Sequence, residues 1–215
     1  MARVSKLRSR DSFRRRSGQK PPRSITLIVC EGETERVYMD AARKLYRLTT
    51  AEIVLAENTK GSAPISVVEC AQEKGREQGG YDKIYCIFDR NGHESFDRAR
   101  TKIKTLANSK RKPLPIEGAI SIPCFEIWVL LHFVRRDAPF HTCNDVIHQI
   151  RSNYMEHYEK ADAAVSNQLM TTVEAAIENA EWLVSRAVNN NHNPYTSVHH
   201  VLRHFKSVTE QEIAP

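Results

Sequence analysis

The sequence predicts an α/β fold, in which a parallel β-sheet flanked by helices is followed by an all-helical C-terminal region. Between residues 24 and 122, short apolar runs rich in β-branched residues alternate with segments whose apolar residues recur at spacings of three and four. The alternation ends at Pro123, and beyond it only the helical spacing continues. Alternating strands and helices favour a parallel sheet with right-handed crossovers. We therefore predict an α/β domain over residues 24–122 and a helical region over residues 123–215.

Four strands and three helices are expected within the α/β domain. Residues 25–30 are apolar except for Thr26, which is typical of a strand buried on both faces. Pro64 suits the first turn of a helix, where its missing N–H has no partner to lose. The predicted strands are residues 24–30, 52–57, 81–88 and 119–122, and the predicted helices are residues 34–48, 64–77 and 94–107.

The C-terminal region is expected to contain four helices. Residues 124–133 are nearly all apolar and follow a proline, which indicates a buried helix. Amphipathic helices are predicted over residues 145–158, 169–188 and 198–208. Trp128 and His132 on the first of these helices are interpreted as core residues. His200 and His204 have a spacing that can bind zinc on a helix, but we interpret them as packing residues because no Glu follows His200.

The positive charge of the chain is concentrated at its start. Residues 1–23 contain nine Lys or Arg against one acid, Asp11, so the remaining chain carries about −2 of the net charge of +6. Low hydrophobicity predicts a basic, disordered tail. Two interpretations stay open: the tail binds phosphate backbones, or it is a solvated segment that aids solubility. The positive charge is thereby attributed to the tail and not to the folded part.

The composition also bears on the compartment. No apolar run reaches the roughly 18 residues of a membrane span, and we expect neither a signal peptide nor a membrane partner. The cysteines are odd in number and scattered, which predicts reduced thiols in a cytoplasmic protein. They are Cys30, Cys70, Cys86, Cys124 and Cys143.

Acidic and amide side chains follow three of the predicted strands. Glu31 ends the first strand, Asp89 and Asn91 follow the third, and Glu126 follows the fourth through Pro123. The carboxyl ends of parallel strands are where α/β proteins build their sites. Oxygen ligands of this kind suit Mg²⁺ or Mn²⁺. We therefore predict a divalent-cation site that serves phosphoryl chemistry.

Glu126 has a further reason to belong to a site, since a carboxylate in an apolar helix must be paired or face a polar cavity.

The other charged candidates each have two interpretations. Glu33 and Glu35 either join the cation site or favour the positive start of a helix. Arg90 either binds a substrate phosphate or forms a salt bridge.

His93 is either a general acid or phosphate contact, or an ordinary loop residue. Lys160 either neutralises the scissile phosphate or is solvated.

Several motifs resemble those of one family. The runs L-I-V-C-E-G-E-T-E, I-F-D-R-N-x-H-x-x-F and S-I-P-C-F-E-I-W-V-L-L-H-F, with the later Y-x-K and N-P-x-T-x-V, are similar to RloB-like proteins of the Toprim superfamily. This resemblance implies a Toprim-like fold and Mg²⁺-dependent phosphodiester chemistry. It makes Glu31 the acid–base or metal-linked residue and Asp89 the leading metal ligand. It also implies a nuclease of a prokaryotic anti-phage, abortive-infection type of defence, working with an ATPase partner of the AAA or ABC type.

The chain departs from the Toprim pattern at one position. The second acid of the expected Asp-x-Asp is Asn91, and Gly92 follows where another acid is expected. An amide oxygen still ligates a cation but supplies less charge. The alternative is a decayed Toprim protein that only binds nucleic acid or docks on the ATPase. The substrate stays open between DNA and RNA, tRNA included, as does the oligomeric state. Nucleotide binding is disfavoured because the chain has no G-x-G-x-x-G or P-loop motif.

Overall fold

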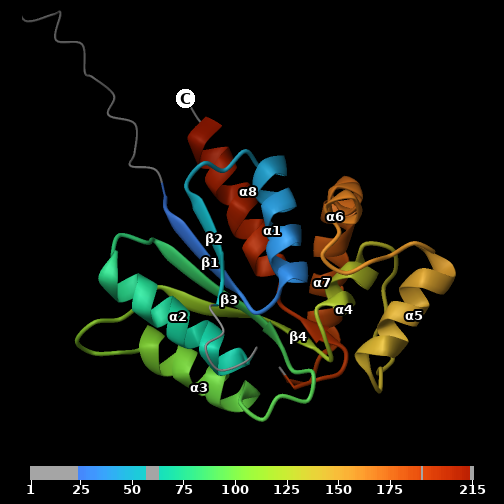
Figure 1. The fold of residues 1–215 in the computed structure, drawn as a ribbon, viewed down its shortest axis with the longest axis horizontal. Helices are drawn as coiled ribbons and strands as arrows, with labels where there is room; N and C mark the ends of the chain where they lie inside the picture. Colours follow the sequence, from blue (N-terminus) through green and yellow to red (C-terminus); the bar gives the residue numbers. More distant parts are fainter. Residues whose placement is uncertain (1–23, 57–62, 190, 214–215) are drawn as a thin grey trace, which may run out of the picture.

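The computed structural model describes residues 24–56, 63–189 and 191–213. Its centre is a five-stranded sheet in the order β2-β1-β3-β4-β5 (Figure 1). The first four strands are parallel, and β5 runs antiparallel to β4. The strands are β1 (Thr26–Cys30), β2 (Ala51–Leu55), β3 (Lys83–Asp89), β4 (Ile116–Ile122) and β5 (Tyr195–Thr196).

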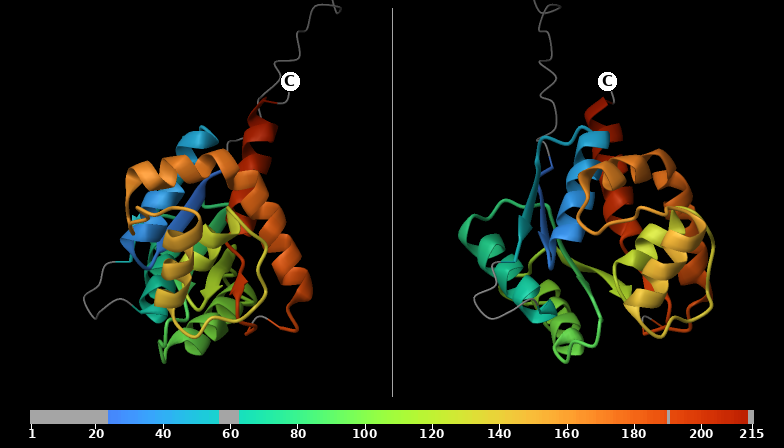
Figure 2. Two further views of the ribbon diagram at one scale, coloured as in Figure 1. Left: turned by 90° about the vertical axis from the view of Figure 1, so that its right-hand side faces the viewer. Right: turned by 45° about the vertical axis from the view of Figure 1, so that its right-hand side comes forward.

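Helices cover both faces of the sheet. Helices α2 and α3 lie on one face and α1 and α8 on the other, while α4 to α7 gather beyond one end of the sheet (Figures 1 and 2). None of the helices described combines the length and the apolar character that crossing a bilayer requires. The helices are α1 (Glu33–Leu45), α2 (Pro64–Glu77), α3 (Phe96–Ala107), α4 (Glu126–Leu131), α5 (Cys143–Asn153), α6 (Ala163–Leu169), α7 (Val173–Arg186) and α8 (His199–Ile213).

Two apolar cores hold these layers together. Alternate side chains of β1 point to opposite faces, so Leu27 and Val29 pack with α2 and α3, whereas Ile28 and Cys30 pack with α1 and α8. The second of these cores continues into the helical region, where Trp128 is fully buried. The predicted fold class is confirmed, and the arrangement is consistent with a Toprim-like fold. The basic tail predicted over residues 1–23 lies outside the described residues.

The helical region also contributes to the sheet, which the sequence did not predict. Strand β5 pairs Thr196 with Ser121, and the two hydroxyl oxygens are 3.0 Å apart. Ser197 Oγ accepts a hydrogen bond from the Ile120 N–H at 3.0 Å. A strand of two residues is too short to show a periodicity, so only the fold reveals it.

Two further expectations are corrected. The predicted helix over residues 169–188 is divided, because the 3₁₀ turn Met170–Thr172 separates α6 from α7. The expectation of five reduced thiols is wrong for two of them, since Cys124 and Cys143 form a disulfide. These residues are 19 positions apart and are brought together by the packing of α4 against α5. Cys30, Cys70 and Cys86 are free.

His132 is a core residue, as predicted. Its Nε2 lies 2.9 Å from Tyr38 Oη, and its Nδ1 lies 3.0 Å from Thr172 Oγ1. Burial lowers the pKa of His132 to about 3, because the charged imidazolium has lost its water. The side chain therefore stays neutral in the folded protein at all mildly acidic values of pH.

We predict that His132 makes the protein sensitive to mild acid. The unfolded chain protonates this histidine near pH 6.5, whereas the folded chain resists protonation until about pH 3. Its contribution to stability is therefore complete above pH 6.5 and falls as the pH drops, by about 2 kcal/mol at pH 5. Chemical unfolding between pH 7 and pH 5 measures this loss. In His132→Gln, which cannot titrate, the free energy of unfolding should depend less steeply on pH; parallel curves for the two proteins would contradict the prediction.

Candidate active site

A cleft of about 230 Å³ opens at the carboxyl ends of the parallel strands. It collects residues that follow β1, β3 and β4, together with one residue from the loop before α6. Seven of the nine candidate residues identified in the sequence line this cleft. The lining consists of Glu31, Gly32, Thr34, Glu35, Asp89, Asn91, His93, Phe125, Glu126 and Lys160.

The register of the sheet positions Glu31. Strands β1 and β3 pair Cys30 with Ile87, and the Glu31 N–H extends this ladder by donating to the Ile87 carbonyl at 3.0 Å. The Glu31 side chain, 7% exposed, accepts a hydrogen bond from the Asp89 N–H at 3.1 Å. Its other oxygen lies 3.4 Å from His93 Nε2. Glu31 is therefore held between the ends of two strands.

Gly32 makes room for a second carboxylate. A Cβ at this position would lie 3.0 Å from Glu35 Oε2, which is too close for an ordinary contact. Glu35 is buried in the first turn of α1. Its pKa is raised to about 7, chiefly by burial and further by the charges of Glu31 and Glu126, while its own backbone hydrogen bond and Lys160 oppose the rise. Glu35 thus takes up or releases a proton near neutral pH.

Asp89 lies at the centre of the acidic side chains. Its Oδ2 accepts a hydrogen bond from the Phe125 N–H at 3.3 Å, which ties β3 to the start of α4. Burial raises the pKa of Asp89 to about 8, and the negative charges of Glu31, Glu35 and Glu126 add to this rise. In the absence of a cation, these carboxylates cannot all be ionised at neutral pH without repelling one another.

Glu126 completes the acidic lining and has a cationic partner. Its Oε1 lies 2.7 Å from Lys160 Nζ, and only 2% of its side chain is exposed. Lys160 is half exposed at the mouth of the cleft. The sequence required Glu126 to be paired or to face a site, and in the structure it does both. Lys160 thus lines the cleft, and its ammonium group forms an ion pair with the Glu126 carboxylate.

Among the residues that the structure describes, two groups of side chains have the spacing of a metal site. In the first, ligand atoms of Glu31, Asp89 and His93 all lie within 4.8 Å of one another. In the second, the same holds for Glu126 and the two cysteines of the disulfide, whose sulfur atoms are already bonded to each other. The first group, with hard oxygen donors, fits Mg²⁺ or Mn²⁺.

Asn91 is exposed on the lining of the cleft. Its backbone has a φ of 25°, a conformation that asparagine tolerates better than most residues, and its N–H donates to the Pro123 carbonyl at 2.9 Å. Asn91 is therefore available as a neutral ligand at the rim.

Two of the candidate residues, Arg90 and Glu33, lie outside the cleft lining. Arg90 does not line the cleft, because it follows Asp89 and its side chain turns away, with the guanidinium 5.3 Å from the centre of the Phe96 ring. Arg90 thus lies outside the cleft lining, and its contact with a substrate phosphate stays a prediction. Glu33 is also outside, with its carboxylate 2.6 Å from Arg36 Nε.

The His200 and His204 pair forms no zinc site. His200 Nδ1 lies 2.8 Å from Glu117 Oε1, and His204 Nε2 lies 2.8 Å from Thr26 Oγ1. Each histidine thus has its own partner, as the packing interpretation requires.

Sequence reasoning missed the contributions of Phe125 and Thr34. Phe125 acts through its backbone N–H on Asp89, and no residue type marks such a role. The only sequence feature that could have indicated this role is that Phe125 directly precedes Glu126, in the apolar segment after a predicted strand. Thr34 lines the cleft beside Gly32, and a single Thr within an acidic run gives no sequence signal of a site.

Comparison with known proteins identifies one match. A family model described as RloB-like protein matches residues 26–205, a range that includes every residue lining the cleft and excludes the basic tail. No curated protein and no solved structure matches the chain.

We predict that Asp89 destabilises the cation-free protein at alkaline pH. Its pKa is raised in the folded state from its usual 3.8 to about 8, so its contribution to stability is complete below pH 4 and is lost as the pH rises towards 8. Asp89→Asn keeps an acceptor for the Phe125 N–H and carries no charge. In EDTA, the variant should unfold at a higher temperature than the wild type at pH 8.5, with a smaller difference at pH 5. Adding Mg²⁺ should raise the midpoint of the wild type more than that of the variant. Equal shifts with Mg²⁺ would show that Asp89 does not bind the cation.

Proposed function

The chain belongs to the RloB-like protein family, and from that premise we propose that it is a metal-dependent nuclease that hydrolyses phosphodiester bonds of DNA or RNA. One observation carries the proposal. Four carboxylates, those of Glu31, Glu35, Asp89 and Glu126, line a single cleft at the carboxyl edge of a parallel sheet. Burial, and after it the neighbouring carboxylates, raises the pKa values of Asp89 and Glu35, which costs stability unless a cation balances the charge.

The donors suit a hard divalent cation. Ligand atoms of Glu31 and Asp89 lie within 4.8 Å of each other, and Asn91 and Glu126 line the same cleft as further ligands. When bound, Mg²⁺ or Mn²⁺ supplies Lewis-acid stabilisation of the negative charge that develops on phosphoryl oxygens. Placing Glu31 after β1 and Asp89 after β3 matches the arrangement expected of a Toprim domain, which is why we include that superfamily in the proposal.

The remaining side chains can position substrate and move protons. Glu35, with a pKa of about 7, exchanges a proton with a reacting group at neutral pH. His93 lies at the rim, 3.4 Å from Glu31, where it can donate a proton to the leaving oxygen. Lys160 presents a half-exposed ammonium group that can contact a phosphate without leaving Glu126.

The biological setting is part of the proposal. We place the enzyme in prokaryotic anti-phage defence with an AAA- or ABC-type ATPase as its partner, and this rests on the resemblance of its motifs to RloB-like nucleases. The nine Lys or Arg of residues 1–23 favour nucleic acid as a partner, with tRNA among the candidates.

Replacing Glu31 tests the chemistry. In Glu31→Gln, cleavage of plasmid, linear DNA or total tRNA should fall by about a hundredfold or more, because a buried acid of the site is lost. EDTA should abolish the activity of the wild type, and Mg²⁺ or Mn²⁺ should restore it. The matched control is Glu33→Gln, which removes an exposed acid two residues away that pairs with Arg36 outside the cleft. If the wild type cleaves nothing even with the ATPase partner present, the protein is a binding subunit.

The second candidate, a decayed protein that binds without cleaving, is favoured by Asn91 alone. Under the nuclease proposal, Asn91→Asp should tighten Mg²⁺ binding because it adds a charged ligand, but change the rate little at saturating Mg²⁺. Titration of the rate with Mg²⁺ separates the two quantities. A large gain in maximal rate would instead indicate that the natural site had lost its chemistry at this position.

A further inference from the structure

The segment formed by α3 and the loop after it carries a concentration of positive charge. Residues 96–112 contain seven Lys or Arg against one acid, Asp97, which gives a net charge of +6. Residues 24–215 carry −2 in total, so the rest of that part of the chain carries −8. The attribution of positive charge to the tail alone is therefore incomplete, because a second basic segment belongs to the folded part.

The packing of α3 turns these charges outward. An apolar stripe faces the sheet and is buried, and it consists of Phe96, Ala99, Ile103 and Leu106. The cationic residues of α3 occupy the sequence positions between these apolar residues and therefore lie on other sides of the helix. Arg98 and Lys104 are exposed on the helix, and so are all three cations of the loop, Lys110, Arg111 and Lys112. We call this surface the α3 basic face.

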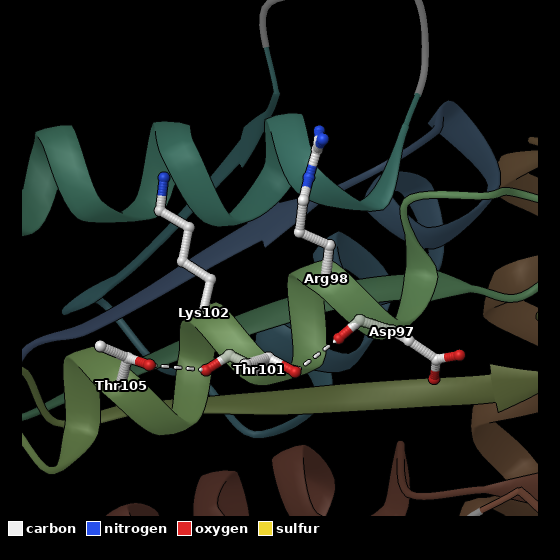
Figure 3. A pocket seen from close by; sticks show the side chains of 5 residues that line it. All are labelled: Asp97, Arg98, Thr101, Lys102 and Thr105. Carbon is white, nitrogen blue, oxygen red and sulfur yellow. Dashed lines mark hydrogen bonds between the residues drawn. The ribbon is translucent and has the colours of Figure 1, made fainter.

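A wide, open hollow lies along this face and is lined by residues of α3: Asp97, Arg98, Thr101, Lys102 and Thr105. It has a volume of about 530 Å³. Figure 3 shows Arg98 and Lys102, one turn apart, extending from α3 in the same direction. The hydroxyls of Thr101 and Thr105 donate to the carbonyls of Asp97 and Thr101, at 2.9 and 3.0 Å, so their hydrogens are already engaged. The charged donors of the hollow are therefore Arg98 and Lys102.

Few of these cations are neutralised by the protein itself. Lys102 lies 3.1 Å from a Glu69 oxygen, and Arg100 lies 3.5 Å from an Asp97 oxygen. The other five form no ion pair with any residue in the described part of the chain. They are Arg98, Lys104, Lys110, Arg111 and Lys112. Uncompensated charges of one sign repel one another, and an anion that spans several of them relieves the repulsion.

The α3 basic face begins beside the cleft. Helix α3 starts directly after the loop that carries Asn91 and His93, and it leads away from the carboxyl edge of the sheet (Figure 1). The cleft itself is lined by four carboxylates, which repel phosphates. A nucleic acid thus needs an anchor outside the cleft, and the α3 basic face is adjacent to its rim.

We propose that the α3 basic face binds the phosphate backbone of a nucleic acid and presents it to the cleft. The role of the cleft rests on the proposed nuclease function, whereas binding on α3 does not require catalysis. DNA and RNA share the phosphate chemistry that this face recognises, and the loop cations extend the binding surface beyond the length of the helix.

Binding by the full-length chain tests this proposal without relying on cleavage. The background is Asp89→Asn in EDTA, and fluorescence anisotropy measures affinity for duplex DNA, duplex RNA and tRNA over a range of salt concentrations. The test variant adds the replacement of Arg98, Lys110, Arg111 and Lys112 by Ser. Its affinity should fall, and for duplex DNA the slope of log K against log salt should become shallower by about 0.9 for each phosphate that the variant no longer neutralises. The probe whose affinity falls most identifies the preferred nucleic acid.

The matched control removes the same number of charges from the other side of the molecule. Lys44, Arg186, Arg203 and Lys206 lie at the surface of α1, α7 and α8, and replacing them by Ser should leave the slope unchanged. Equal losses of affinity in both variants would mean that only net charge matters, and an unchanged slope in the test variant would mean that residues 1–23 supply the binding. Either result overturns the proposal. Thermal unfolding checks that both variants fold, and the triple loop variant of residues 110–112 replaces the test variant if Arg98→Ser impairs folding. A wild type without nuclease activity would leave these binding results unaffected.

Discussion

The parallel pairing of β1 with β3 is the constraint on which the candidate site depends. Cys30, the last residue of β1, pairs with Ile87, so Glu31 lies beside the end of β3, and the Asp89 N–H donates to the Glu31 carboxylate. A slip of one residue would turn Glu31 towards the opposite face of the sheet. The two apolar cores fix this register, because Leu27 and Val29 on one face and Ile28 and Cys30 on the other must all be buried. The positions of the Glu31 and Asp89 side chains in the cleft thus depend on apolar packing elsewhere along the strands.

The cleft works against the stability of the fold. Four carboxylates share it, and Lys160 is the cation that pairs most closely with one of them, Glu126. Burial, together with the charges of the neighbouring carboxylates, raises the pKa values of Asp89 and Glu35. Backbone donors, such as the Phe125 N–H, oppose part of this rise but supply no net charge. Such a site is expected where function, and not stability, selects the residues.

Much of the fold and of the candidate site can be predicted from the sequence. The physical reasons for this also explain which features cannot be predicted. Buried strands show themselves by β-branched runs, and acids placed directly after such runs are forced to one edge by the parallel topology. That logic predicted where Glu31, Asp89 and Glu126 lie. It does not reveal which way a side chain turns, as with Arg90, whose guanidinium lies over the Phe96 ring outside the cleft lining. Nor does it reveal pairings without a periodic signal, such as strand β5 and the Cys124–Cys143 disulfide.

The distribution of charge links the two proposals. A cleft lined by carboxylates repels phosphates, and the α3 basic face beside it attracts them. A cation bound among Glu31 and Asp89 would remove the repulsion while leaving the attraction unchanged. The cation and the nucleic acid would then strengthen each other's binding, and because binding free energies are reciprocal, each would do so by the same factor. Coupling of this kind lets a nucleic acid rest on α3 without entering the cleft until a cation is present. If both proposals hold, the separation of the acidic and basic surfaces would let the cation control when a nucleic acid that is already bound enters the cleft.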